Sequence, residues 1–423
     1  MVAGFRAAGA AIAACRLYAL HVTSDMSGAA ELEAQGGQVR ASTLELFFDL
    51  VFVFTITQLT HVFTHHPGWQ ELGQVALMFA IIWWMYSGYV FLTNEVAPST
   101  SSRRTFLLLG MFGFFVIAIS IPHAFGGTGL VFGLGYIVVN TVHTLMFATA
   151  GGAGASSAML RLAPLNAVSA GLVLAGGIAD GRLRGVLWTL AIVLQIVTPY
   201  VVRVEGFVIR PSHFCERHGL VVIVALGESV VAIGANLGDQ DLTVGLIASV
   251  ALGLTLGYVL WWAYFGFDDE RGEHALHALP AAVRTRPAVL AYGYSLYIVL
   301  IGIILTAAGI AMTIAHGNQP ASKAAALALS GGVALFFLGQ CAFRLTLRLP
   351  RPWWRLLAAV CVLATTPIGF AWVAWGQLGV LILVAYGFVI ADDLMSIRAG
   401  EDSAYVRPEI SAVGRLMTRN QQQ

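Results

Sequence analysis

One carboxyl group lies in an apolar segment where an unpaired charge is costly. Glu228 falls within the apolar run 219–237, roughly 15 Å from its start at helical rise, and Ser229 follows it. An ionised carboxylate near the centre of a membrane helix costs about 2.5–3.5 kcal/mol on insertion scales, so such a group is protonated, paired with a cation or coordinating an ion. We therefore predict that Glu228 binds a proton or an ion, on a path that includes Ser229.

A second set of polar residues lies along the apolar run 44–64. Glu45 and Asp49 are four residues apart and share a helix face, and Gln58 and His61 are three apart nearer the other end. This pattern predicts a helix that lines a cavity or a path for an ion or solute. The alternative is that Glu45 and Asp49 pair with arginines and hold helices together.

Other polar residues fit more than one role. Glu216 and Arg217 precede the run that contains Glu228; they are candidates for the path, although an ion-pair network that anchors the helix is favoured over direct ligands. Asn140 and His143 are three apart in another apolar run. They fit an interhelical hydrogen bond as well as a ligand site.

Acidic residues near the predicted helix ends are expected to meet water. The segment 268–277 carries acids and histidines at helical spacing, but we expect a solvated cytoplasmic loop there rather than a metal site. Asp392 and Asp393 are expected to face the cytoplasm. No catalytic motif occurs, such as a nucleophile elbow, a P-loop or HExxH, so the sequence predicts no enzyme activity, no cofactor and no metal.

Two segments share the pattern W-W-x-Y-x-G-[YF], at residues 83–89 and 261–267. They lie six predicted helices apart, which indicates two halves in the same orientation, as in the parallel repeats of several transporters. Aromatic residues that gather at membrane interfaces are the alternative explanation. The aromatic residues expected to gate or pack the path are Trp83, Trp84, Tyr86, Trp261, Trp262 and Tyr264.

The elements that must hold these residues are membrane helices. The 423 residues are 58% hydrophobic and 11% charged, with a mean hydropathy of +0.79, whereas soluble domains have about 25% charged residues. This composition excludes a soluble enzyme and a nucleic-acid binder and indicates an all-α polytopic membrane protein. Twelve segments are predicted to span the bilayer: 44–64, 73–93, 105–121, 130–150, 164–178, 185–202, 219–237, 242–266, 287–314, 324–343, 356–373 and 376–391.

The positive charges fix the predicted orientation. Of the 23 lysines and arginines, all but Arg182, Arg184 and Lys323 fall on one side of this twelve-helix arrangement. Positive residues stay on the cytoplasmic side, so both termini are predicted to be cytoplasmic. The predicted organisation is an N-terminal tail, a first six-helix half, a cytoplasmic connector, a second six-helix half and a C-terminal tail, at 1–43, 44–202, 203–218, 219–391 and 392–423.

Two stretches resemble the signatures of the bacterial low temperature requirement protein A family. Ser42–Phe54 followed by Thr57-Gln58-Leu59 is similar to the first signature. Glu216-Arg217-x-Gly219-Leu220 followed by Leu226-Gly227-Glu228-Ser229 is similar to the second. The likeness extends over roughly residues 38–395 and implies a polytopic protein of the bacterial inner membrane, but no settled substrate or reaction. Leu296 and Asn140 stand where the family is expected to have a histidine and an arginine.

These observations favour a secondary transporter of a small solute or ion, built from two six-helix halves and coupled through Glu228. The alternatives are a cation channel that uses the same two helices as pore walls, and a membrane protein that acts in cold adaptation without transport. The expected partners are the lipid bilayer and the transported solute or ion. A homodimer is compatible with the sequence. Cys15 is not expected to be a lipid anchor, and Met26 is an alternative start.

Overall fold

The computed structural model describes residues 42–202, 206–237, 243–314 and 318–400. These residues form helices and no β strand, and twelve helical segments are long and apolar enough to cross a membrane. The predicted all-α membrane fold is therefore confirmed. The expectations for the tail 1–43, for Cys15 and Met26, and for the tail beyond residue 400 fall outside the described residues, apart from the two residues that begin the first helix.

The first six spans are single helices, apart from a 3-10 turn that ends the third, whereas several of the later spans are divided. The first six are α2 (Thr43–His65), α3 (Trp69–Glu95), α4 (Ser101–Ser120), α5 (Gly129–Ala150), α6 (Ala153–Ile178) and α7 (Arg182–Val201). The remaining spans contain α8 (Pro211–Leu237), α9 (Val244–Phe265), α10 (Asp268–Ala278), α11 (Thr285–Ala288), the π-helix η3 (Val289–Ser295), α12 (Leu296–Ile314), α13 (Lys323–Leu347), α14 (Pro352–Leu363), α15 (Thr366–Ala371) and α16 (Ala374–Ala399). Short 3-10 turns, η1 (Ile121–His123) and η2 (Ala281–Val283), complete the described elements.

Three helices extend well beyond their predicted segments. α6 begins at Ala153 and continues through Pro164. α8 begins at Pro211, inside the predicted connector 203–218, and α16 continues to Ala399. The added turns of α8 and α16 contain charged residues that a hydropathy criterion rejects. They are stabilised as helix because buried partners on other helices compensate their charges.

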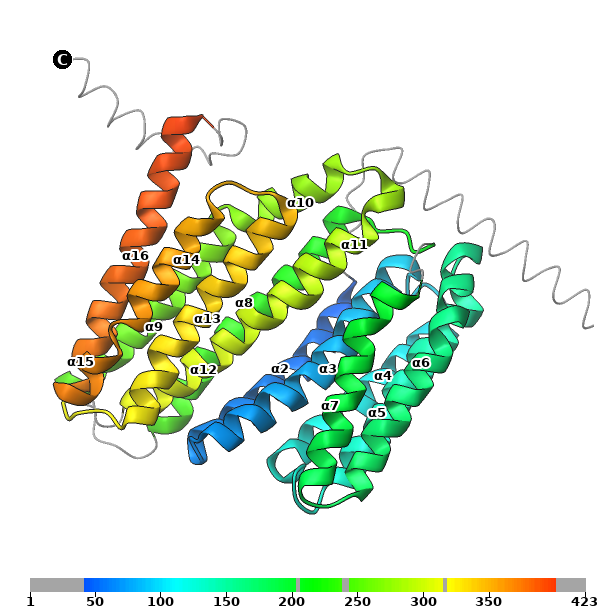
Figure 1. Cartoon of the computed structure of the whole chain (residues 1–423), viewed down its shortest axis with the longest axis horizontal. Coiled ribbons are helices and arrows are strands. Elements are labelled where there is room, and N and C mark those ends of the chain that lie inside the picture. Colours follow the sequence, from blue (N-terminus) through cyan, green and yellow to red (C-terminus); the bar gives the residue numbers. More distant parts are fainter. Residues whose placement is uncertain (1–41, 203–205, 238–242, 315–317, 401–423) are drawn as a thin grey trace, which may run out of the picture. The chain divides into compact units, whose positions relative to one another are not determined.

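The helices form two groups, α2–α7 and α8–α16. In the first group α2 packs against α4, α4 against α5, α5 against α6, and α6 against α7. In the second group α8 packs against α12, α12 against α13, α13 against α14, and α14 and α15 against α16. The two groups meet through α2 and α3, both of which contact α8 and α12 (Figure 1). Polar residues on α2 therefore face the start of the second group.

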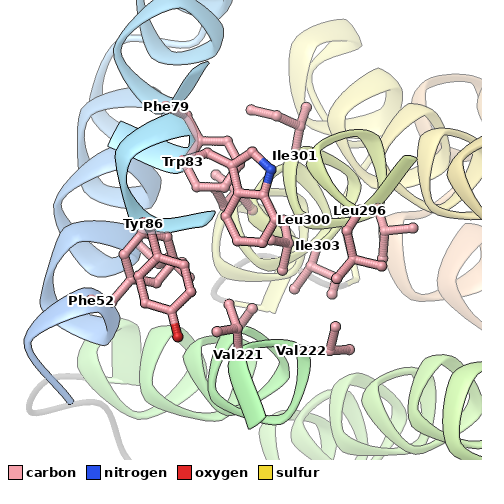
Figure 2. Packing of buried hydrophobic residues seen from close by; sticks show 14 of the residues in the cluster. Phe52, Phe79, Trp83, Tyr86, Val221, Val222, Leu296, Leu300, Ile301 and Ile303 are labelled. Carbon is pink, nitrogen blue, oxygen red and sulfur yellow. The ribbon is translucent and has the colours of Figure 1, made fainter. Parts of the chain in front are cut away.

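Large apolar side chains fill the junction between the groups. Phe52 of α2 and Phe79 and Tyr86 of α3 lie opposite Val222 of α8 and Leu300 of α12 (Figure 2), and each is at most 1% exposed. The rings of Phe52 and Tyr86 are 4.1 Å apart between centroids. Such aromatic contacts add to the packing energy. Any polar group at this junction is consequently shielded from lipid and water by close-packed side chains.

α12 and α13 approach each other through glycines. A Cβ atom at Gly332 would lie 2.5 Å from the backbone nitrogen of Thr306 and 2.8 Å from the carbonyl oxygen of Gly302. A Cβ at Gly309 would lie 2.6 Å from the Cα of Leu329. These contacts involve backbone atoms, so a side chain at either position would force the two helices apart.

We expect Gly332→Ala to destabilise the protein, because the added methyl group meets the α12 backbone. Overpacking of this kind lowers the free energy of unfolding by about 1–3 kcal/mol. Gly379→Ala in α16 is the matched control, since no atom lies within 4 Å of its added Cβ. Thermal midpoints in detergent measure the difference. Equal midpoints for the two variants would contradict the described packing.

Candidate functional site

The first turns of α2 and α8 are joined by a buried carboxylate. Ser42 caps α2: its Oγ accepts a hydrogen bond from the Glu45 backbone N–H at 3.4 Å, and Glu45 Oε2 accepts one from the Ser42 N–H at 2.7 Å. The other Glu45 oxygen lies 3.2 Å from His213 Nε2 on α8. Both Glu45 and His213 are buried. The capping box thus also positions the carboxylate against α8.

One turn further along, Asp49 and Arg217 form a buried ion pair. Arg217 Nη2 donates to Asp49 Oδ1 at 2.9 Å, and the Tyr86 hydroxyl of α3 donates to the same oxygen at 2.5 Å. The side chains of Arg217 and Asp49 are 1% and 3% exposed. Asp49 Oδ2 and the Arg217 Nε and Nη1 atoms have no hydrogen-bond partner among the described residues. The pair therefore retains unused donors and acceptors in a buried position.

Glu228 differs from most of the other buried carboxylates. It is 2% exposed, and its Oε2 accepts a hydrogen bond from Thr57 Oγ1 of α2 at 2.5 Å. No arginine, lysine or histidine among the described residues forms an ion pair with it. Every other buried carboxylate in the described residues, Asp393 excepted, lies within 4 Å of an arginine or histidine. Within the part of the chain that the structure describes, Glu228 is thus a buried acid without a compensating cation.

The α2–α8 interface therefore has two polar positions with an apolar stretch between them. Asp49 and Thr57 are eight residues apart, roughly 12 Å at helical rise. Phe52 and Ile56 of α2 and Val221 of α8 are buried within this stretch. Water and ions cannot pass between the two positions unless this packing opens, since such side chains present no hydrogen-bonding groups.

The other residues predicted for the path make no recorded contact with the polar groups of these two positions. Ser229 is buried, and its hydroxyl has no hydrogen-bond partner among the described residues. Gln58 is half-buried beside Thr57, and Glu216 is exposed at the start of α8. His61 is exposed, with its ring centroid 3.9 Å from that of His65. The structure thus brings Glu45, Asp49 and Arg217 together but does not join His61 to them.

The first aromatic motif connects the two helix groups. Trp83 is buried, and its indole Nε1 donates to the carbonyl oxygen of Gly293 in η3 at 2.6 Å. Trp83 also stacks on Tyr86, the hydrogen-bond partner of Asp49, with 5.7 Å between centroids. Trp84 stacks on Tyr294 of η3. π-helical segments often occur at functional sites, and here one is held by the motif across the junction.

The second motif occupies a different setting. Trp262 Nε1 donates to Asp393 Oδ2 at 2.8 Å, and Tyr264 is 2% exposed. Trp261 is half-buried and packs against Tyr258 and Trp262. The two motifs therefore share buried tyrosines and one indole hydrogen bond each, but their bonding partners differ.

A small cavity lies beside Trp83, between the first helix group and the segment α11–η3 of the second. Its volume is about 120 Å³, and it is bordered by α3, α5, α6, α7 and η3, including Ser87 and Asn166. His143 also borders it; neither of its ring nitrogens has a hydrogen-bond partner among the described residues. Asn140 instead places its Nδ2 3.8 Å from Met85 Sδ. Of the two candidates on α5, His143 is the one beside a cavity.

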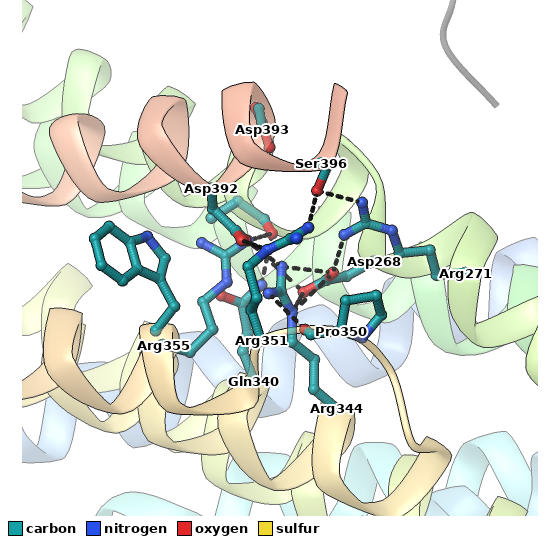
Figure 3. Close-up of polar contacts among 12 residues, drawn as sticks. Asp268, Arg271, Gln340, Arg344, Pro350, Arg351, Arg355, Asp392, Asp393 and Ser396 are labelled. Carbon is teal, nitrogen blue, oxygen red and sulfur yellow. Dashed lines mark hydrogen bonds and ion pairs between the residues drawn. The ribbon is translucent and has the colours of Figure 1, made fainter. Parts of the chain in front are cut away.

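A second ionic network ties together helices of the second group (Figure 3). Arg344 of α13 lies 2.9 Å from Asp268 Oδ1 of α10 and 2.7 Å from Asp392 Oδ2 of α16. All three side chains are 1% exposed. One guanidinium group therefore compensates two buried carboxylates from distant parts of the chain.

Further arginines and polar groups surround this centre. Arg351 Nε donates to Asp392 Oδ1 at 3.0 Å, and Arg351 also contacts Ser396. Arg355 Nη2 donates to the carbonyl oxygen of Ala263 at 3.2 Å and lies 3.5 Å from Asp392. Arg271 Nη2 donates to Ser396 Oγ at 2.9 Å. The network consequently joins α10, α13, α14 and α16.

The expectation that the acids of segment 268–277 and of the end of α16 face water is wrong for Asp268, Asp392 and Asp393. Asp268 begins the helix α10 and is buried, although a solvated loop was predicted for 268–277, and Asp392 and Asp393 are buried as well. Sequence alone treats the arginines near residue 350 as loop charges. One feature of the sequence could have indicated the network. The acids at the ends of two helices and several arginines are all predicted at the same membrane face, where they can pair.

We expect Arg344→Met to destabilise the protein strongly, because it leaves Asp268 and Asp392 without their shared partner. Removing one member of a buried ion pair costs about 3–5 kcal/mol. Arg348→Met, at an exposed position one turn later, is the control. Chemical unfolding in detergent measures both variants. If Arg344→Met unfolds like Arg348→Met, the network does not stabilise the fold.

Comparison with known proteins agrees with these features. Residues 40–390 match the family described as "Bacterial low temperature requirement A protein (LtrA)". "Uncharacterized protein RA0937" of Rhizobium meliloti (strain 1021) is 30% identical over 314 residues, which cover 71% of this chain and 76% of that protein. The match includes α2, α8 and both of their polar positions. The chain is therefore a multi-pass membrane protein that belongs to the bacterial low temperature requirement A family.

Proposed function

We propose that this protein is a secondary transporter of a small solute or ion in the bacterial inner membrane. In this proposal Glu228 binds the coupling proton or cation, and the α2–α8 interface opens alternately toward the two sides. The observation that carries the proposal is the burial of Glu228 with Thr57 as its partner and, among the residues with described positions, no cation beside it. Binding a proton or a cation would remove the cost of a charged acid in this setting.

The Asp49–Arg217 pair gives the same interface a second polar position. Its unused oxygen and nitrogen atoms can accept water or a polar solute when the surrounding packing loosens. The apolar stretch around Phe52 and Val221 keeps the two polar positions apart in the described conformation. A closed barrier between two polar positions is what alternating access requires, since the two sides must never be connected at once.

The arrangement of the two groups supports the parallel repeat. Packing of α4 on α5 in the first group corresponds to packing of α12 on α13 in the second, and α2 on α4 corresponds to α8 on α12. The two aromatic motifs lie on α3 and α9, which are the second span of each group. In the proposed cycle the two groups move as units about α2 and α3. Both termini are cytoplasmic in this arrangement.

We expect Glu228→Gln to abolish gradient-driven transport without unfolding the protein. Glutamine keeps an oxygen that can accept the Thr57 hydrogen bond but cannot carry the titratable proton. The assay uses proteoliposomes with a trapped pH dye, a panel of small solutes, and imposed pH or sodium gradients. Glu71→Gln, in the first turn of α3, is the matched control.

The assay also separates the alternatives. Uptake by the wild type and by Glu71→Gln that falls to the level of protein-free liposomes in Glu228→Gln supports the proposal. Normal gradient-driven uptake by Glu228→Gln would refute the coupling role. Steady currents at fixed voltage that exceed the rate at which a transporter can complete its cycle would favour a cation channel. Absence of flux for every solute and gradient in the wild type would favour a protein that does not transport.

We expect neutralisation of both Asp49 and Arg217 to be better tolerated than neutralisation of one. Asp49→Asn leaves Arg217 buried and unpaired, which lowers the free energy of unfolding by about 3–5 kcal/mol. The double variant Asp49→Asn/Arg217→Gln removes both charges and should recover most of this loss. The thermal midpoints of the wild type, both single variants and the double variant form a double-mutant cycle. Additive effects would show that the two residues do not interact energetically.

A further inference from the structure

An apolar groove separates the two helix groups at one end of the interface. Its volume is about 510 Å³, and its lining comes from α2 and α3 on one side and from α12, α13 and α14 on the other. Phe63 and Leu72 represent the first side, and Leu305, Leu335 and Leu338 the second. All five helices belong to the spanning segments, and Leu338 is 42% exposed. The groove therefore opens toward the hydrocarbon of the bilayer.

An open apolar groove in a bilayer is best filled by a hydrocarbon chain. Its lining carries few polar groups, so a compact polar solute would lose its hydrogen bonds there. A flexible acyl chain instead gains dispersion contacts with the leucine and phenylalanine side chains, which would otherwise lack neighbours on one side. The apolar lining therefore indicates that a hydrocarbon chain lies in the groove, but it does not indicate which headgroup the chain carries.

The end of the groove supplies a positive charge. Lys323, the single lysine of the sequence, is exposed at the start of α13 and lines the groove together with Trp69, which is 76% exposed at the start of α3. Among the described residues Lys323 forms no ion pair; its Nζ lies 6.0 Å from the ring centroid of Phe370. Tryptophan and lysine at helix ends are typical of the membrane–water interface. An anionic headgroup would meet an uncompensated cation there.

We propose that this groove holds one acyl chain of an anionic phospholipid whose phosphate pairs with Lys323. The lipid would be an intrinsic part of the junction, since one wall of the groove belongs to each helix group. This proposal does not depend on Glu228 or on transport. We therefore expect the protein to select its bound lipid by the charge of the headgroup as well as by the acyl chain.

The test is native mass spectrometry of the purified full-length protein with added phosphatidylglycerol or phosphatidylcholine that carry identical chains. Lys323→Gln should reduce the preference for phosphatidylglycerol by about fivefold, which corresponds to one lysine near a membrane surface. Arg182→Gln is the control, because it removes an exposed cation predicted at the same membrane face but outside the groove. Its preference should equal that of the wild type.

A second pair of variants tests the groove itself. Leu335→Trp should fill the groove and lower the retention of both lipids. Leu338→Trp should lower it too, and because Leu338 lies at the open edge of the groove, this variant should destabilise the fold less. Leu383→Trp, on the exposed face of α16, should retain lipid like the wild type.

An unchanged preference for phosphatidylglycerol in Lys323→Gln would overturn the proposal. So would full lipid retention by both groove variants, or retention of detergent alone by the wild type.

Discussion

Compensation of buried charge is the constraint on which the rest of this structure depends. An ion inside a helical membrane protein must find a partner within the fold, since neither lipid nor water supplies one. Asp49 meets Arg217 across α2 and α8, and Arg344 meets Asp268 and Asp392 across three helices. These pairs fix which helices are neighbours although they are distant in sequence. Glu228, like Asp393, has no ion-pair partner among the described residues, and its position directs the functional interpretation to the α2–α8 interface.

Hydropathy was sufficient to predict the twelve spans, because each helix needs a long apolar run whatever its neighbours are. It failed where charge pairing extends a helix, as at Pro211–Arg217 in α8 and at Asp392 in α16. That Glu228 lies inside a helix could also be predicted, since it falls within a long apolar run. Its partner Thr57 could not, nor could the pairing of Arg344, because both depend on how separate helices pack.

Leu296 and Asn140, where a histidine and an arginine are expected from the family resemblance, have apolar or weakly polar surroundings. Leu296 is fully buried directly after the π-helix η3, and Asn140 contacts the sulfur of Met85. A histidine and an arginine at these positions would add charges near the junction of the two groups. Near that junction lie the Glu228 carboxyl, which accepts a hydrogen bond from Thr57, and buried atoms of Asp49, Arg217 and Ser229 that have no hydrogen-bond partner among the described residues.

The central claim is that the Glu228 carboxyl exchanges a proton or a cation with water during function. Infrared difference spectroscopy of the protein in lipid, stepped between acidic and alkaline buffer in H₂O and D₂O, tests this most directly. We expect a carboxyl band that responds to the pH step, shifts in D₂O and disappears in Glu228→Gln. A spectrum without any pH-dependent or deuterium-sensitive contribution from Glu228, in the presence or absence of sodium, would contradict it.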